Sequence, residues 1–240
     1  MPFPFPHALL ASIVVAAGAL VQGSIGFGAG VLAAPLLLLI DAHLVPGPVL
    51  LSGFVLTALV ALRERATVDV RGVAWALVGR LPGTALGVFA LLWVPARELA
   101  TLCGVLMLIG VALSASRIRI DTTRTNLIGA GIASGVMGTM TSMGGPSIAL
   151  MYQHAEGPKL RGTMSVYFLF SGAMSLIGLV SAGLFGEREL MATLPLLPGV
   201  LVGFFASRWT RTRLDAGGTR TAVLALAGFA AASVLVKQWW

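Results

Sequence analysis

The sequence predicts an all-α polytopic membrane protein with about eight hydrophobic segments, two of them broken re-entrant hairpins, arranged in two inverted repeats. Three observations support this fold class: the composition, the recurrence of long apolar segments, and a repeated motif. Of the 240 residues, 57% are apolar and only 10% are charged, whereas soluble domains carry about 25% charged residues. Because a soluble fold of this size could not bury so much apolar surface, we expect the bilayer to surround the chain.

The apolar segments are long enough to define the elements, since a helix needs about 20 apolar residues to cross a bilayer. The first and fifth are too long for one simple helix, and each holds a glycine cluster, Gly23–Gly30 and Met143–Pro146. We expect a half-helix from near Ala29-Gly30 to Ile40, and another that begins at Pro146, whose missing N–H costs nothing there. The eight segments are His7–Ile40, Leu44–Leu62, Gly72–Trp93, Leu99–Ser116, Thr125–Tyr152, Gly162–Gly186, Leu190–Ser207 and Thr221–Val236.

A repeated motif indicates an internal duplication. The string LPGTALGVFA at residues 81–90 recurs as LPGVLVGFFA at residues 197–206, an offset of 116. Transporters are often built from such repeats, with the substrate site at the repeat interface. We therefore predict a first transmembrane repeat at residues 1–116, a cytoplasmic linker at 117–124, and a second transmembrane repeat at 125–240.

The distribution of Lys and Arg favours the hairpins. If all eight segments cross once, the basic residues outside the membrane divide eight against seven, which is no bias. If the first and fifth segments enter and leave on one side, the division becomes twelve against three, a strong positive-inside pattern. Each half then crosses a net three times, so the second half is inverted and both termini are extracytoplasmic. Eight simple crossings with kinks at the glycines are the alternative.

Composition also excludes several function classes. The net charge of +7 sits in short loops between apolar segments, as expected beside anionic lipid, so we expect a lipid bilayer and no nucleic acid as partner. The single cysteine, Cys103, excludes a disulfide framework and a cysteine-based zinc site. No Asp or Glu lies deep in an apolar segment, and no catalytic constellation is present. We therefore predict no enzyme activity, no metal and no cofactor, and the sequence does not determine whether the chain forms a homo-oligomer.

The glycine clusters are the strongest candidates for a binding site. Non-helical backbone at membrane depth is tolerated only where protein buries it or water reaches it. Two half-helix N-termini would present free N–H groups and partial positive charge, which suits a small anion. Alternatively, the glycines only allow close helix packing. The predicted substrate-binding residues are Gln22, Ser24, Gly26, Gly28, Gly30, Arg80, Thr141, Ser142, Gly144, Gly145 and Pro146, with Thr139 as a further hydroxyl donor.

Arg80 is the only charge well inside an apolar segment. Ionisable residues at such positions are functional candidates, and this one could neutralise a bound anion. Alternatively, its long side chain snorkels to the cytoplasmic surface, about two turns away.

The two glycine-rich strings resemble the TauE/SafE family of sulfite and organosulfonate exporters, also called the toluene-sulfonate uptake permease family. The strings are VQGSIGFGAGVLAAPLLLL at residues 21–39 and GVMGTMTSMGGPSIALM at residues 135–151, each followed by LPGxxxGxFA. The resemblance covers essentially the whole chain and implies transport of sulfur-containing oxyanions or related organic anions. The chain departs from the usual family pattern in its Phe- and Pro-rich start, and in Gly-Gly-Pro where many members continue with another glycine.

The expected function is therefore transport of small sulfur-containing anions, such as sulfite or sulfonates, by alternating access in the cell (inner) membrane. A passive anion channel would share the fold. A membrane scaffold or assembly protein without transport is the second alternative, and it would tolerate bulky residues at the glycines.

Overall fold

The computed structural model describes residues 5–64, 68–116, 118, 120–214 and 218–239, and every regular element within these ranges is helical. The predicted all-α class is confirmed. The first half contains α1 (Phe5–Ile25), α2 (Ala29–Ile40), the 3-10 helix η1 (Ala42–Leu44), α3 (Gly47–Glu64), α4 (Val70–Trp93) and α5 (Ala96–Ala115). The second half contains α6 (Arg124–Thr141), α7 (Gly145–Tyr152), α8 (Gly157–Ser181), α9 (Glu187–Thr193), η2 (Leu194–Leu196), α10 (Leu197–Leu214) and α11 (Gly218–Trp239).

Several helices are long and apolar enough to cross a bilayer, which agrees with a multi-pass membrane protein. Within the described ranges there are six such stretches: Pro6–Ile25, Gly47–Glu64, Val70–Trp93, Glu98–Ala115, Gly157–Ser181 and Glu187–Thr210. Two shorter apolar helical stretches are Ala29–Ile40 and Leu224–Val236. The expected count of eight hydrophobic segments stays a prediction, because the first and fifth are each divided between two helices.

The first long segment breaks at its glycine cluster. α1 ends at Ile25, and Gly26 and Gly28 follow with φ of 105° and 114°, a backbone region that glycine adopts without steric cost. The next helix, α2, runs from Ala29 to Ile40, as the sequence predicts.

The second long segment breaks at the corresponding place. α6 ends at Thr141, Ser142 adopts a left-handed conformation with φ of 61°, and α7 begins at Gly145. Pro146 lies in the first turn of α7, where a helix has no acceptor for a backbone N–H in any case. The helix start is therefore within one residue of the predicted position.

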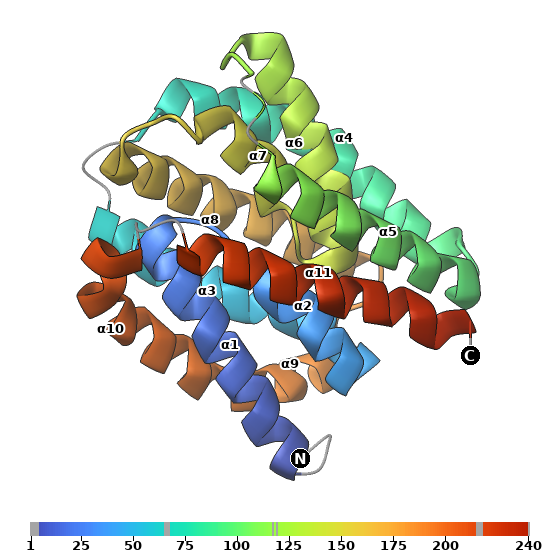
Figure 1. Cartoon of the computed structure of the whole chain (residues 1–240). Helices are drawn as coiled ribbons and strands as arrows, with labels where there is room; N and C mark the ends of the chain where they lie inside the picture. Colours follow the sequence, from blue (N-terminus) through green and yellow to red (C-terminus); the bar gives the residue numbers. More distant parts are fainter. Residues whose placement is uncertain (1–4, 65–67, 117, 119, 215–217, 240) are drawn as a thin grey trace.

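The helices of the two halves interleave (Figure 1). α1 packs along α10, and its counterpart α6 packs along α4. α3 packs against α8 in opposite directions, because Phe54 lies beside Gly172 while Glu64, at the end of α3, reaches Arg161 near the start of α8. Corresponding helices of the two halves therefore meet in the middle of the molecule.

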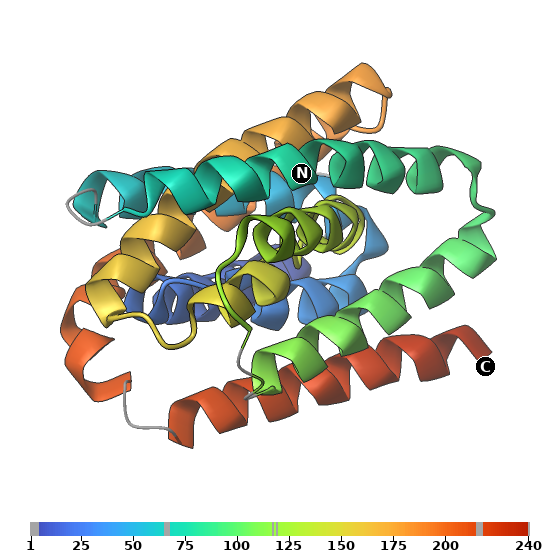
Figure 2. The same cartoon turned by 90° about the horizontal axis from the view of Figure 1, so that it is seen from above.

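The helices α5 and α11 are a second pair of corresponding helices that pack against each other. Val111 lies beside Gly228, whereas Leu235 lies beside Gly104, so these two helices also run in opposite directions. In both views they lie together on one face of the molecule (Figures 1 and 2).

The repeated LPGxxxGxFA motif is a helix-packing surface. A Cβ at Gly83 in α4 would overlap the Ile132 carbonyl of α6, and a Cβ at Gly199 in α10 would overlap the Ser12 carbonyl of α1. Small residues let membrane helices approach this closely. The two copies of the motif therefore hold together two helix pairs, α4 with α6 and α10 with α1.

Candidate functional site

The two helix breaks meet in the middle of the chain's fold. A Cβ added at Gly30, in the first turn of α2, would overlap the carbonyl of Ser142 in the second break. A Cβ added at Gly145 would lie 3.9 Å from the Cβ of Phe27 in the first break. Two irregular segments from different halves of the sequence thus form one contact region.

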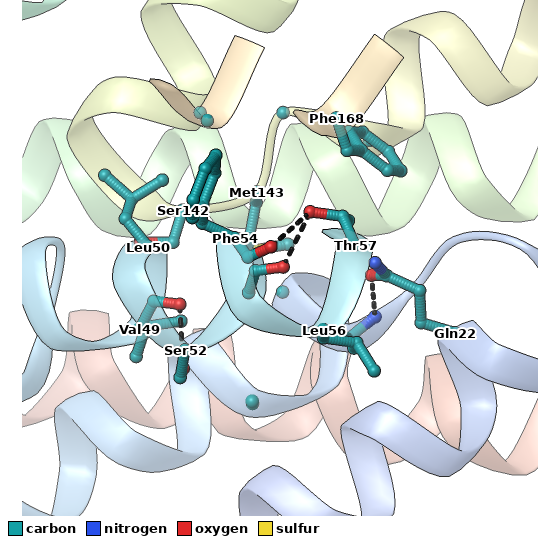
Figure 3. A pocket seen from close by; sticks show the side chains of 18 of the residues that line it. Gln22, Val49, Leu50, Ser52, Phe54, Leu56, Thr57, Ser142, Met143 and Phe168 are labelled. Atoms are coloured by element: carbon teal, nitrogen blue, oxygen red, sulfur yellow. Dashed lines mark hydrogen bonds between the residues drawn. The ribbon is translucent and has the colours of Figure 1, made fainter. Parts of the chain in front are cut away.

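A cavity of about 90 Å³ lies beside this contact region. It is lined by both breaks together with parts of α1, α3, α4 and α8, and Figure 3 shows Phe54, Thr57 and Phe168 around it. One water molecule needs about 10–15 Å³ of such space. The cavity can therefore hold a small ion of several heavy atoms.

The lining has an apolar part and a polar part. The apolar side chains include Val15, Val49, Leu50, Phe54, Leu56, Phe168 and Val200. The neutral polar side chains are Gln22, Ser52, Thr57, Ser142 and Ser171, and Arg80 is the only charged one among the residues that line this cavity.

Arg80 is buried at the cavity wall, with 2% of its surface exposed. Its Nη1 donates to the carbonyl of Ser134 and, at 2.8 Å, to the Ser134 hydroxyl. Its Nη2 donates to the Ser175 hydroxyl at 2.7 Å and to the Ser171 carbonyl at 3.4 Å. Tyr167 donates its hydroxyl to Ser134 Oγ at 2.8 Å. The guanidinium is thus held by α6 and α8, and the alternative that Arg80 snorkels to the surface is wrong.

The positive charge of Arg80 has no carboxylate partner within 4 Å among the described residues. Its Nε is buried and has no hydrogen-bond partner in the described part of the chain. An uncompensated buried charge is costly, so an anion in the adjacent cavity would stabilise this arrangement.

Two glycines make room for the guanidinium. An added Cβ at Gly138 would lie 2.7 Å from both terminal nitrogens of Arg80, and one at Gly144 would lie 2.7 Å from Nη1. Gly144 also accepts a hydrogen bond from Ser134 Oγ at 2.6 Å. Glycine in α6 at Gly138 and in the second break at Gly144 therefore leaves the space that the guanidinium occupies.

The starts of α2 and α7 contribute backbone donors. Ala29 N–H donates to Gln22 Oε1 at 3.3 Å, so Gln22 caps α2. The other N–H groups in a first helical turn have no acceptor inside the helix, and Gly30 and Gly145, which supply two of them, line the cavity.

The structure brings seven of the eleven predicted residues together at the cavity: Gln22, Gly28, Gly30, Arg80, Ser142, Gly144 and Gly145. Their role in substrate binding stays a prediction. The other four, Ser24, Gly26, Thr141 and Pro146, are not among the lining residues.

These four have other neighbours in the structure. Ser24 Oγ donates to the Leu20 carbonyl at 2.7 Å and lies 3.0 Å from the Thr210 hydroxyl. Thr141 Oγ1 donates to the Met137 carbonyl at 2.6 Å, and Gly26 packs against Arg161. Pro146 faces α5, because its Cγ would lie 3.5 Å from a Cβ added at Gly110. The further donor Thr139 lies 2.9 Å from Ser175 Oγ, and therefore reaches Arg80 only through that serine.

The sequence analysis missed the side chains that hold Arg80 and those that form the apolar wall. Tyr167, Ser171 and Ser175 carry a readable signal, because they follow one another at intervals of four residues and so share one face of α8. Ser134, Phe54 and Phe168 carry no comparable signal, since single polar or aromatic residues are common in such helices.

The comparison with protein families gives one match. A family model described as "Sulfite exporter TauE/SafE" matches residues 10–234, nearly the full chain. No curated protein and no solved structure matches the chain. By its sequence across almost all of its length, the chain belongs to the TauE/SafE family of sulfite exporters.

Proposed function

We propose that this protein transports small sulfur-containing anions, such as sulfite, sulfonates or related organic anions, across the cell (inner) membrane by alternating access. The cavity between the two helix breaks is the substrate site. The observation that carries the proposal is Arg80, a buried cation at the cavity wall with no carboxylate partner among the described residues. The family match supports the sulfur-containing substrate class.

In this proposal the anion's oxygens take the donors that the protein leaves available. Arg80 supplies charge and the Nε–H donor, which has no hydrogen-bond partner among the described residues. The first turns of α2 and α7 add backbone N–H groups, as helix N-termini do for anions generally. Gly30 lets the Ser142 carbonyl lie against the start of α2, so the two helix breaks pack closely beside the cavity.

The same proposal includes two inverted repeats, with α1–α2 and α6–α7 as re-entrant hairpins. Its support is the packing: α3 and α8, and likewise α5 and α11, are corresponding helices that run in opposite directions. The pair α1–α10 has its counterpart in α6–α4. A two-fold axis that relates two antiparallel helices is perpendicular to both. If those helices span the bilayer, the axis lies in the membrane plane.

Counterflow in proteoliposomes tests the function. Vesicles loaded with unlabelled sulfite should transiently accumulate radiolabelled sulfite, with saturation, because a carrier exchanges one anion for another. A passive channel would equilibrate the label without transient accumulation, and a scaffold would give neither flux nor binding. Either result from folded protein would contradict the proposal.

A matched pair of variants tests the site. Arg80→Gln removes the buried charge and should weaken sulfite binding by about 10–100-fold, the range for a lost hydrogen bond to a charged group. Arg208→Gln, which removes an exposed charge, should leave binding unchanged. Arg80→Lys keeps the charge, and it separates loss of charge from loss of fold. Normal transport by a well-folded Arg80→Gln protein would refute the assignment.

A further inference from the structure

The formal charge of the cavity comes from one described side chain. Of the described residues that line it, Arg80 alone carries a formal charge, and no described Asp or Glu lies within 4 Å of its guanidinium. The hydrogen-bond partners of Arg80 are neutral hydroxyl and carbonyl groups, and Tyr167 is the titratable side chain of that network. The site therefore offers a net charge of +1 to a ligand.

The helix ends add donors without adding net charge. Each break places the C-terminus of one helix, at Ile25 or Thr141, only a few residues from the N-terminus of the next, at Ala29 or Gly145. The partial charges of the two ends have opposite signs, so they offset each other at short range. A ligand gains hydrogen bonds from the helix starts, but the formal charge that it meets is still that of Arg80.

The rest of the cavity wall disfavours a ligand that carries a second negative charge. Much of the lining is aliphatic or aromatic, and Phe54 and Phe168 are its bulkiest apolar members. The free energy needed to take an ion out of water grows with the square of its charge. An apolar wall offers neither hydrogen bonds nor charges to offset that cost. A single guanidinium can neutralise one charge and would leave the second unpaired.

We infer that this site selects anions by charge and takes monoanions: hydrogensulfite instead of the sulfite dianion, and singly charged sulfonates instead of disulfonates, sulfate or thiosulfate. The inference rests on the proposed function, and it defines the substrate class of that same cavity. Since hydrogensulfite and sulfite interconvert near neutral pH, each transported sulfite carries a proton with it.

A ligand panel on the wild-type protein in proteoliposomes tests the charge rule. Ethane-1,2-disulfonate and butane-1-sulfonate have similar lengths but different charges, and sulfate provides a compact dianion. We expect butane-1-sulfonate and methanesulfonate to compete with radiolabelled sulfite, and the dianions to compete at least about 100-fold more weakly, because one charge stays unpaired. Sulfate or the disulfonate competing within tenfold of the monoanions would overturn the rule.

The pH dependence provides a second test with an internal control. Sulfite uptake should fall as pH rises, in proportion to the remaining hydrogensulfite, whereas competition by methanesulfonate, which does not titrate in this range, should stay constant. A pH effect on the protein itself would change both ligands together. Sulfite uptake that does not follow the hydrogensulfite fraction would contradict the inference.

Gly53 offers a way to change the charge of the cavity. It lines the cavity, and an added Cβ meets no atom within 4 Å. Gly53→Lys should raise the affinity for sulfate relative to methanesulfonate by about tenfold compared with Gly53→Gln, which has similar bulk and no charge. An unchanged ratio would show that formal charge does not set the preference.

The outcomes separate this inference from the proposed function. Transport of monoanions and dianions with similar affinity would overturn the charge rule alone and leave the anion transporter intact. No binding or transport of any anion by folded protein would overturn both, because no anion site would remain.

Discussion

At the scale of single residues, Gly138 is predicted to keep Arg80 in place. An added Cβ would lie 2.7 Å from both terminal nitrogens of the guanidinium, so Gly138→Ala should push Arg80 away from Ser175. We expect sulfite affinity to fall about tenfold or more through the lost charge-assisted hydrogen bonds. Overpacking should lower the free energy of unfolding by about 1–3 kcal/mol. Binding assays and thermal unfolding in detergent measure the two effects.

Gly129 provides the control in the same helix, α6. It is exposed, and an added Cβ meets no atom within 4 Å. Gly129→Ala should leave affinity unchanged and raise stability by about 0.5–1 kcal/mol, because alanine loses less backbone entropy in a helix. If Gly138→Ala and Gly129→Ala behave alike, the guanidinium does not depend on the glycine.

At this scale the sequence predicts the charge but not its surroundings. Arg80 stands out because a cation inside an apolar segment is rare. Its partners Ser134 and Ser175 are 54 and 95 residues away, so only the packing of three helices brings them together. Gln22 shows a different limit: it lines the cavity, yet its side-chain oxygen accepts the N–H of Ala29, which residue type alone does not reveal.

At the scale of helices, the repeated glycines should be required for packing in both halves. Gly83→Ala would press on the Ile132 carbonyl, and Gly199→Ala would press on the Ser12 carbonyl. We expect each substitution to lower the free energy of unfolding by about 1–3 kcal/mol, since the backbones must move apart. Thermal stability of the purified variants measures this. Stability equal to wild type in both would mean that the helices are not so closely packed.

A charged cluster joins α3 to α8 beside the first break. Glu64 Oε1 lies 3.2 Å from Arg63 Nε, and Glu64 Oε2 lies 3.6 Å from Arg161 Nε; all three side chains are at most 13% exposed. Glu64→Gln should therefore destabilise the protein by about 2–4 kcal/mol, because it removes the negative charge that faces two largely buried arginines.

A double-mutant cycle isolates the link between the two helices. Glu64→Gln combined with Arg161→Gln should cost less than the sum of the single substitutions, with a coupling energy of about 0.5–3 kcal/mol. Additive effects on thermal unfolding would show that Glu64 and Arg161 do not stabilise the α3–α8 contact.

The helix breaks are the elements that the sequence predicts best. Glycine at positive φ and proline in a first helical turn have direct backbone causes, and α2 and α7 begin at Ala29 and Gly145. The packing role of LPGxxxGxFA is harder to predict from the sequence than the helix breaks are. The repeat indicates duplication, but the partner of each copy is a helix of the other half, and no local pattern in the sequence identifies it.

At the scale of the whole molecule, helices of the first half pack mainly against helices of the second half. Shifting α1, α3 and α4 by 116 residues gives ranges that overlap α6, α8 and α10, and the contacts α1–α10 and α3–α8 have the counterparts α6–α4 and α8–α3. Each half therefore packs several of its glycines against the other half, as Gly83 does against Ile132 and Gly199 against Ser12. Arg117 and Arg119, in the predicted linker 117–124, lie outside the described residues, so the linker stays a prediction.

The inverted arrangement can be tested with cysteines at equivalent positions. Arg71 and Glu187 differ by the repeat offset of 116 and are both exposed. Cys103 is the only cysteine, so Cys103→Ala gives a cysteine-free background. In it, Arg71→Cys should resist a membrane-impermeant maleimide added outside intact cells and react after permeabilisation. Glu187→Cys should react from outside, because inverted repeats put equivalent positions on opposite sides.

Lys159 provides the reference for absolute orientation. It lies near the start of α8, whose 25 residues span about 37 Å at 1.5 Å per residue, so Lys159→Cys should be cytoplasmic and Glu187→Cys should not. Equal labelling of Arg71→Cys and Glu187→Cys would mean that the repeats are parallel. Reaction of Lys159→Cys from outside, with Glu187→Cys protected, would keep the inverted repeats and reverse the whole molecule, contrary to the excess of Lys and Arg on its proposed cytoplasmic side.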